Sequence, residues 1–398
     1  MTQKINLALE PCIVCGSSDF DQTVLGTSLA DASDFTNKDE KQGLFLYELV
    51  TCLACNHSSI QTDNPCWMPT RKHDFIKYGE PTEHYSQISE TLKTLNLEFN
   101  EVSVHTFSYK DFQLANLLAS DLNISSLELK NFAGCSGDWL PSAYSSDSIG
   151  EPKALTSFIT EIRESKKTHK IILITRFFDH VHDRDLIQTI LKLYSPSTHI
   201  VFDLNDYDRL FELDTLEFVW NERRNFFTQK NLASLLNKAS VKFSMFTYES
   251  KAVSPTLTGV ISGRLPSNMN SDAAVISQSS NPHLGDKLIA LRQLWQLELK
   301  LGHKLAIIGA SHKGISLAQF VLYAEASFSL HDDKEALKGK TPPVIPPLGF
   351  HSISGFDFSK YSHAAMTTTR AVAEKIIPKL RESGFTGQFL DFDCRPFN

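Results

Sequence analysis

The sequence has no apolar run of the length that a membrane-crossing helix needs, which is about 20 residues. Its first residues, MTQKINLALEPC, are too polar for a secretory signal. A disulfide pattern is also missing, because Cys66, Cys135 and Cys394 show no pairing, and this fits a reducing compartment. Together these absences predict a cytoplasmic protein without a membrane partner.

Concentrated positive charge is missing as well. The 39 lysines and arginines are scattered along the chain, no basic run stands out, and the formal net charge is −7. Proteins that bind nucleic acid need a basic surface, so we expect no nucleic-acid partner. Internal repeats and low-complexity tracts are absent too, so the 398 residues are expected to form about two or three ordinary domains.

Cysteine is scarce, but four of the seven cysteines form two Cys-x-x-Cys pairs, Cys12/Cys15 and Cys52/Cys55. Each spacer lets both sulfurs of a pair point at one ion, and Gly16 after the first pair favours the tight turn that this requires. Four thiolates fill the tetrahedron around Zn²⁺ and leave no open position for chemistry. The pattern therefore predicts a structural zinc site, the alternative being four unrelated buried or free thiols.

From Ser125 onward, short apolar runs alternate with helical periods, as in a parallel sheet covered by helices. Strands are predicted at SLELK, KIILITRFF and THIVFDLN, and helices at ALTSFITEIRESKK and RDLIQTILKLYS. This βαβαβ order predicts a Rossmann-like domain. After it, Thr228 is a plausible N-cap for a helix that ends near Lys238.

A third unit follows a Ser-, Pro- and Gly-rich stretch at 254–281. It contains a long amphipathic helix and then HKLAIIGASHKG, which reads as strand, glycine turn and helix, with Gly309 and Gly314 in the turn. Such a turn can bring backbone N–H groups to an anion, although any parallel βα unit needs small residues there. The predicted fold is α/β, with a four-cysteine zinc module at 1–70, a Rossmann-like domain at 71–253 and a carboxy-terminal α/β domain at 282–398.

The order of these parts resembles the sugar C-methyltransferases, which carry an amino-terminal zinc module, a central S-adenosylmethionine domain and a carboxy-terminal α/β domain. The resemblance covers nearly the whole chain, and the order of parts is its strongest element. The segments that carry it are the two cysteine pairs, LGTSLADASDF (25–35), TRFFDHVHD (175–183), FDLNDYDRLFE (202–212), WNERRNFFT (220–228), GASHKG (309–314) and KGKTPPVIPP (338–347).

The resemblance implies methyl transfer from S-adenosylmethionine to a carbon beside a keto group of a nucleotide-linked deoxysugar. That reaction needs a base for a carbon-bound proton and a sulfonium methyl held in line. In its catalytic loop the family usually has Tyr-His-Glu-His, of which only Glu222 remains here, and Arg223 stays protonated and cannot simply replace an imidazole as base. His180, beside His182 and Asp183 after a buried strand, is a further acid/base or metal-binding candidate, or a merely solvated turn.

The resemblance places the donor turn at NFAGCSGD, where Gly134 and Gly137 follow a strand, and Glu151 is the nearest acid for the ribose hydroxyls. Arg223 and Arg224 are candidates for gripping a diphosphate, since guanidinium groups bind phosphate oxygens in pairs, or else they belong to a solvated charged loop.

Three functions stay open. The first, favoured narrowly, is an S-adenosylmethionine-dependent methyltransferase acting on a nucleotide-sugar or a related small molecule, with altered roles for Glu222, Arg223 or His180. The second is an enzyme of another class that binds a nucleotide-sugar without a methyl donor. The third is a catalytically inactive scaffold or regulatory protein, which would bind neither ligand. Function depends on the site rather than the fold, so ligand binding discriminates among them.

Overall fold

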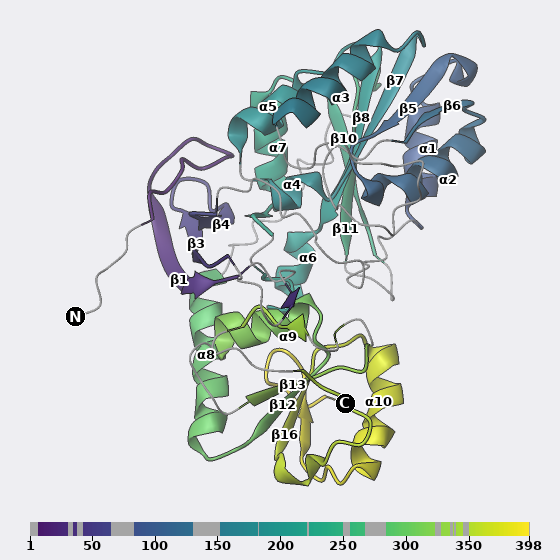
Figure 1. Ribbon diagram of the computed structural model, residues 1–398. Coiled ribbons are helices and arrows are strands. Elements are labelled where there is room, and N and C mark those ends of the chain that lie inside the picture. Colours follow the sequence, from purple (N-terminus) through teal and green to yellow (C-terminus); the bar gives the residue numbers. More distant parts are fainter. Residues whose placement is uncertain are drawn as a thin grey trace.

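The computed structural model describes residues 7–30, 35–37, 43–64, 83–129, 152–181, 183–220, 223–249, 255–266, 284–322, 328–334, 337, 340–344 and 350–397. Three larger sheets follow one another along the chain, with helices around the second and third (Figure 1). Within these ranges no helix combines the length and apolar character needed to cross a membrane.

The amino-terminal sheet is antiparallel and has the order β1-β3-β4-β9. Its strands are β1 (Phe20–Leu29), β3 (Phe45–Cys52), β4 (Ser58–Thr62) and β9 (Asn225–Phe226). The two cysteine pairs lie in the turn before β1 and in the turn between β3 and β4. The fourth strand, β9, comes from far along the chain, so this sheet is completed by the middle of the sequence.

The central sheet has the order β10-β11-β8-β7-β5-β6, in which β6, β5, β7 and β8 are parallel. Its strands are β5 (Val102–Thr106), β6 (Ser126–Glu128), β7 (His169–Thr175), β8 (Thr198–Asn205), β10 (Phe243–Tyr248) and β11 (Thr256–Ile261). The strand β11 runs antiparallel to both neighbours and lies between β8 and β10.

Helices cover both faces of the central sheet. They are α1 (Tyr85–Lys93), α2 (Phe112–Leu122), α3 (Pro152–Glu164), α4 (Phe177–His180), α5 (Arg184–Leu191), α6 (Tyr207–Glu212) and α7 (Gln229–Lys238). Alternate residues of β7 face opposite sides: Ile171 packs in the cluster with α1 and α2, and Ile172 in the cluster with α3, α5 and α7. The predicted α/β layering is confirmed.

Two predicted details of the central sheet are wrong. Its first strand is β5, not the segment after Ser125, because VSVHT carries polar Ser103 and His105 and does not read as an apolar run. Both side chains are nevertheless buried, since Ser103 Oγ and His105 Nε2 hydrogen-bond at 2.8 Å. The strand predicted at KIILITRFF also ends early, at Thr175, because Arg176 adopts a left-handed conformation (φ 58°) and α4 begins after it.

The carboxy-terminal sheet is parallel, with the order β15-β13-β12-β16-β17. Its elements are α8 (Leu284–Lys300), β12 (Leu305–Ile308), α9 (His312–Ser316), a π-helical turn (Leu317–Val321), β13 (Phe328–His331), β15 (Phe350–His351), β16 (His363–Met366), α10 (Arg370–Glu382) and β17 (Gln388–Leu390). Short 3₁₀ turns occur at Phe99–Glu101, Tyr109–Asp111 and Phe358–Lys360.

The amino- and carboxy-terminal sheets share one hydrophobic core, which includes Leu25, Tyr47, Trp295 and Phe392. A two-stranded ribbon, β2 (Thr36–Asn37) with β14 (Lys340–Thr341), joins the same two regions. This shared core packs the amino-terminal sheet against the carboxy-terminal region, as Figure 1 shows for β1, β3 and α8.

Candidate functional site

The four predicted zinc ligands come together in one cluster, with all sulfurs within 4.8 Å of one another. The Sγ atoms of Cys12 and Cys55 are 3.6 Å apart and those of Cys15 and Cys52 are 3.4 Å apart. A tetrahedral zinc ion with Zn–S bonds of about 2.3 Å needs sulfurs about 3.8 Å apart, so the cluster fits Zn²⁺ with little adjustment. The turn geometry is as predicted, because Gly16 has φ +83° and donates from its N–H to the Cys12 carbonyl at 2.7 Å.

Two thiols of this cluster, those of Cys12 and Cys55, differ in their pKa values. The neighbouring Cys55 thiol, despite the opposing effect of burial, lowers the pKa of Cys12 to about 4, and the same contact raises the pKa of Cys55. A zinc ion binds thiolates, so binding here releases protons and weakens as the pH falls.

The amino-terminal sheet fixes the loop that carries Arg223 and Arg224. The N–H of Ile60 in β4 donates to the Arg224 carbonyl at 2.9 Å. His57 Nε2 lies 3.2 Å from Asn225 Oδ1, and the His57 ring stacks on Phe227 with centroids 4.7 Å apart. The segment that follows the second cysteine pair therefore supports a loop almost 170 residues further along the chain.

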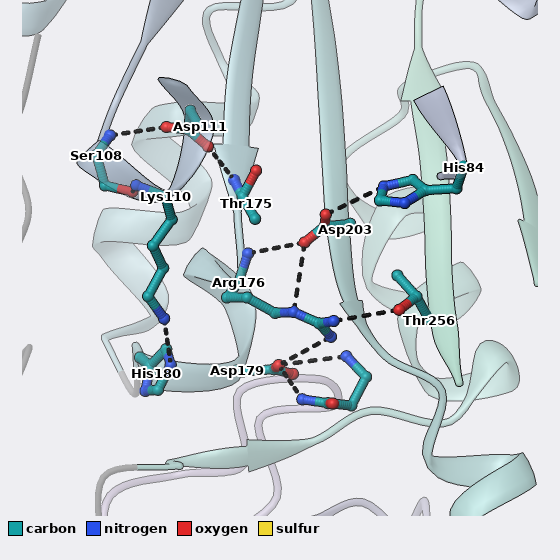
Figure 2. Close-up of polar contacts among 11 residues, drawn as sticks. His84, Ser108, Lys110, Asp111, Thr175, Arg176, Asp179, His180, Asp203 and Thr256 are labelled. Carbon is teal, nitrogen blue, oxygen red and sulfur yellow. Dashed lines mark hydrogen bonds and ion pairs between the residues drawn. The ribbon is translucent and has the colours of Figure 1, made fainter. Parts of the chain in front are cut away.

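A buried charge network lies at the carboxyl ends of β7 and β8 (Figure 2). The Asp203 carboxylate accepts from the Arg176 backbone N–H at 3.1 Å and lies 3.7 Å from Arg176 Nε and 3.3 Å from His84 Nε2. Arg176 Nη2 also donates to Thr256 at 3.1 Å. Burial alone would raise the pKa of Asp203, but the charges of Arg176 and His84 outweigh it and the pKa is lowered.

A second acid in the network, Asp179, belongs to α4. It accepts from the backbone N–H and side-chain Nδ2 of Asn205 at 3.2 and 2.6 Å, and it lies 3.9 Å from Arg176 Nη1. Burial raises its pKa, although the charges of Arg223 and Arg176 act in the opposite direction. The Arg224 N–H donates to the Asp179 backbone carbonyl at 2.7 Å, so Asp179 joins α4 to the loop that carries Arg223 and Arg224.

The loop between β5 and α2 is held by the carboxylate of Asp111. Asp111 accepts from the backbone N–H groups of Phe107 at 2.8 Å, Ser108 at 2.7 Å and Thr175 at 2.6 Å. Complete burial raises the pKa of Asp111 to about 7, against these three hydrogen bonds.

This raised pKa makes a testable contribution to stability. The ordinary pKa is 3.8, so between about pH 4 and about pH 7 the unfolded chain loses this proton while the folded chain keeps it. As the pH rises across that window, we expect the buried Asp111 carboxyl to lower the free energy of unfolding by up to about 4 kcal/mol. The variant Asp111→Asn should lose this part of the pH slope, measured by urea unfolding at several pH values. Asp121→Asn, on an exposed carboxylate whose pKa is lowered, is the control and should keep the slope.

Phe107 fills the space beside the β5–α2 loop. Its ring packs edge-on against Phe158 and Phe177, with centroids 4.9 and 5.0 Å away. Side chains therefore fill one side of the β5–α2 loop.

His180, a predicted site residue, is buried in α4 and lies 3.2 Å from Lys110 Nζ through its Nε2 atom (Figure 2). An ammonium can only donate, so His180 Nε2 acts as the acceptor in this contact. The structure thus places a cation from the β5–α2 loop beside a predicted acid/base group. The other predicted residues, Glu222, Gly134, Gly137, Glu151 and His182, lie outside the described residues.

Arg223 and Arg224 are both buried, so the alternative of a solvated charged loop is wrong. The Arg223 guanidinium lies 3.6 Å from the Trp220 ring centroid and donates through Nη1 to the Phe218 carbonyl at 3.3 Å. Arg224 is only 2% exposed, and its Nη1 and Nη2 atoms find no hydrogen-bond partner in the described part of the chain. Its guanidinium carbon lies 5.4 Å from the Tyr47 ring centroid.

The glycine turn after β12 is packed tightly. A Cβ on Gly314 would lie 2.0 Å from the Gly309 carbonyl oxygen, and Gly309 has φ +103°, which other residues rarely adopt. The Ala310 N–H already donates to Asp332 at 2.8 Å. These contacts favour the architectural interpretation of this turn over anion binding.

Helix α9 begins at this turn. It contacts the arginine loop, the segment from Glu217 to Arg224 that carries Arg223 and Arg224. The His312 ring lies 4.0 Å from the Trp220 ring, and Lys313 Nζ pairs with Glu217 at 2.7 Å. Helix α9 of the carboxy-terminal region thus contacts the loop as well.

Asp203, Arg176 and Asp179 were not identified as site residues from the sequence. The available signal was an acid inside the buried apolar strand THIVFDLN, together with an arginine directly after another such strand. A charge in a buried strand needs a partner, and the neighbouring strand end is the nearest place to find one.

No protein-family model matches the chain, and no curated protein matches it. Three solved structures that it resembles are all methyltransferases. They are the methyltransferase domain of bacterial CtHen1-CN (16% identity, 46% of this chain and 98% of that chain, TM-score 0.29), the S-adenosylmethionine-dependent methyltransferase SibL in its apo form (14%, 45% and 55%, 0.26) and magnesium protoporphyrin IX methyltransferase (ChlM) from Synechocystis PCC 6803 with bound SAH (8%, 47% and 90%, 0.27). At these TM-scores the likeness assigns no function to this chain.

Proposed function

We propose that the chain is a methyltransferase-like enzyme and that its ligand is a small molecule that carries phosphate, namely a nucleotide-linked sugar. The observation that carries this proposal is the Arg224 guanidinium, which is buried and has no hydrogen-bond partner for Nη1 and Nη2 among the described residues. A buried charge without a partner is costly, by several kcal/mol. A phosphate supplies the missing partner, because its oxygens match the two parallel N–H groups of a guanidinium.

The surroundings of Arg224 support a ligand with more than one negative charge. Arg223 is adjacent and buried, and its charge acts on Asp179. Lys110 adds a further cation beside His180 in α4. Ligands of open α/β sheets bind outside the carboxyl ends of the strands, which is the edge where these groups lie. A diphosphate fits two neighbouring guanidinium groups.

Methyl transfer from S-adenosylmethionine is the reaction that we favour. In the family that the sequence resembles, the donor binds beyond the first two strands of the central domain, which here are β5 and β6. The strand β6 ends at Glu128, beside β5, so Glu128 joins Glu151 as a proposed acid for the ribose hydroxyls.

The described residues do not by themselves fit the methyl donor. The β5–α2 loop has no glycine, Asp111 occupies its backbone N–H groups, and Phe107 fills the space beside it. We therefore derive no step through the donor. This loop favours a second candidate, an enzyme that binds the same nucleotide-sugar without a methyl donor. For both candidates, with and without the methyl donor, His180 is the proposed proton-accepting group. Lys110 is the cation that would stabilise a developing negative charge.

Calorimetric titration of the zinc-loaded full chain tests these proposals. We expect a dTDP-linked keto-deoxysugar to bind with a dissociation constant of about micromolar order. Binding of S-adenosylmethionine and of its demethylated product would support methyl transfer, and sugar binding without donor binding would support the second candidate. Failure of the nucleotide-sugar to bind at millimolar concentration would contradict both and leave the scaffold hypothesis.

A further inference from the structure

A second group of metal-binding side chains lies at the amino end of the carboxy-terminal sheet, the end opposite the glycine turn. Glu298 is in the last turns of α8, His303 follows that helix, and His363 begins β16. Their ligand atoms lie within 4.8 Å of one another. We propose that Glu298, His303 and His363 bind a divalent transition metal, Zn²⁺ being the best match, at a site separate from the cysteine cluster.

The end of α8 brings the first two ligands together. Gly302 has φ +83° and its N–H donates to the Leu299 carbonyl, while the His303 N–H donates to the Glu298 carbonyl. These two hydrogen bonds form a Schellman motif, in which the side chains at the positions of Glu298 and His303 meet. That contact is usually hydrophobic, but here it joins a carboxylate and an imidazole.

The three ligand atoms converge on one point. His303 Nδ1 lies 2.7 Å from Glu298 Oε2, and His363 Nε2 lies 3.6 Å from the same oxygen. The two imidazole rings have centroids 4.2 Å apart. Ligands that share a zinc ion at about 2.0–2.2 Å lie about 3–3.6 Å from one another, so a small outward shift of His303 admits the metal.

The hydrogen bonds of Ser362 direct a lone pair of His363 toward this point. The Ser362 hydroxyl donates to the Lys304 carbonyl at 3.3 Å, so its single proton is in use, and it accepts from the Lys304 N–H at 2.9 Å. His363 Nδ1 lies 3.1 Å from the same hydroxyl, and we assign it as the donor, since the hydroxyl proton is then directed at Lys304. In the neutral ring, Nε2 is then unprotonated and faces Glu298. A second hydrogen bond that fixes the tautomer is the usual support of a metal-binding histidine.

The ligand set and its exposure fit an accessible site. Two imidazoles and one carboxylate are a known zinc set, which leaves a fourth position for water or another ligand. The side chains of Glu298 and His303 are 28% and 35% exposed, whereas that of His363 is 9% exposed, so a metal can enter from solvent and meet one fixed ligand. A bound metal ion would cross-link the end of α8 to the start of β16.

The number of zinc ions bound per chain tests the proposed site directly. The purified full chain is dialysed against buffered Zn²⁺ at about 10 μM, and bound zinc is counted by mass spectrometry. We expect the unaltered protein to hold one more zinc ion per chain than Glu298→Gln or His303→Ala, and Cys12→Ser to lose the other ion independently. His351→Asn is the control, since His351 is an exposed histidine of the same sheet outside the cluster, and it should keep both ions.

Equal zinc content in the unaltered chain and in both ligand variants would overturn the proposal and leave the three side chains as an ion pair with a neighbouring histidine. Thermal unfolding with and without zinc gives a second readout. The unaltered chain should gain stability from the added ion, and folded Glu298→Gln should not. Equal gains in both proteins would also overturn the site.

Discussion

Replacing Cys12 by serine is expected to release the zinc ion of the cysteine cluster and to loosen the loop that carries Arg223 and Arg224. Structural zinc contributes about 10–16 kcal/mol of apparent binding free energy in small zinc-binding peptides, and three remaining thiolates hold it far less tightly. We expect the variant to lose this ion and several kcal/mol of stability. Because Ile60 in β4 and His57 just before β4 hold the arginine loop, nucleotide-sugar affinity should fall as well.

Zinc content, thermal unfolding and calorimetric titration measure the three effects. Cys394→Ser is the matched control, because Cys394 lies outside the cysteine cluster. Its zinc content and ligand affinity should stay unchanged. Full zinc retention by Cys12→Ser would show that the four cysteines do not share an ion.

Replacing Arg224 by methionine should separate ligand binding from stability. Methionine has a similar length and no charge, so the variant removes a buried cation whose Nη atoms have no partner among the described residues. We expect the free energy of unfolding to stay the same or rise, since removal of an unpaired buried charge is favourable. We expect nucleotide-sugar affinity to fall by about 100-fold, which corresponds to about 2.7 kcal/mol.

Arg209→Met is the control for the loss of one positive charge. Arg209 is 47% exposed and pairs on the surface with Glu212 and with Glu249 at 2.6 Å, contacts that contribute little. Its ligand affinity should match that of the unaltered chain. A large loss of stability in Arg224→Met with unchanged affinity would instead assign Arg224 a structural role.

Several structural features could be predicted from patterns of neighbouring residues in the sequence. The spacing of Cys12, Cys15, Cys52 and Cys55 encodes two tight turns, and the structure brings all four sulfurs together. Thr228 caps α7 as predicted, with its side chain accepting from the backbone N–H three residues later at 3.2 Å. Such features depend on neighbours within a few residues, which the sequence displays directly.

Elements that depend on distant partners could not be predicted. The strand β9 has two residues and exists because β4 provides its hydrogen bonds. The contacts of Asp203 with Arg176 and His84 depend on which strands are adjacent, and the sequence pattern does not specify that order. His180 and Arg223 were identified as candidates, but their link through Asp179 was not. The roles of Glu222, Gly134, Gly137 and Glu151 stay predictions.

The core shared by the first and last sheets bears on how the protein is made. Leu25 and Tyr47 are translated early, yet they pack in one cluster with Phe392, and Trp295 Nε1 donates to the Phe392 carbonyl. At about 5–20 residues per second, a ribosome needs tens of seconds to produce the intervening chain. During that time the amino-terminal sheet has no complete core, and zinc is what can hold its turns in place. Newly made chains should therefore be most prone to aggregation when zinc is scarce.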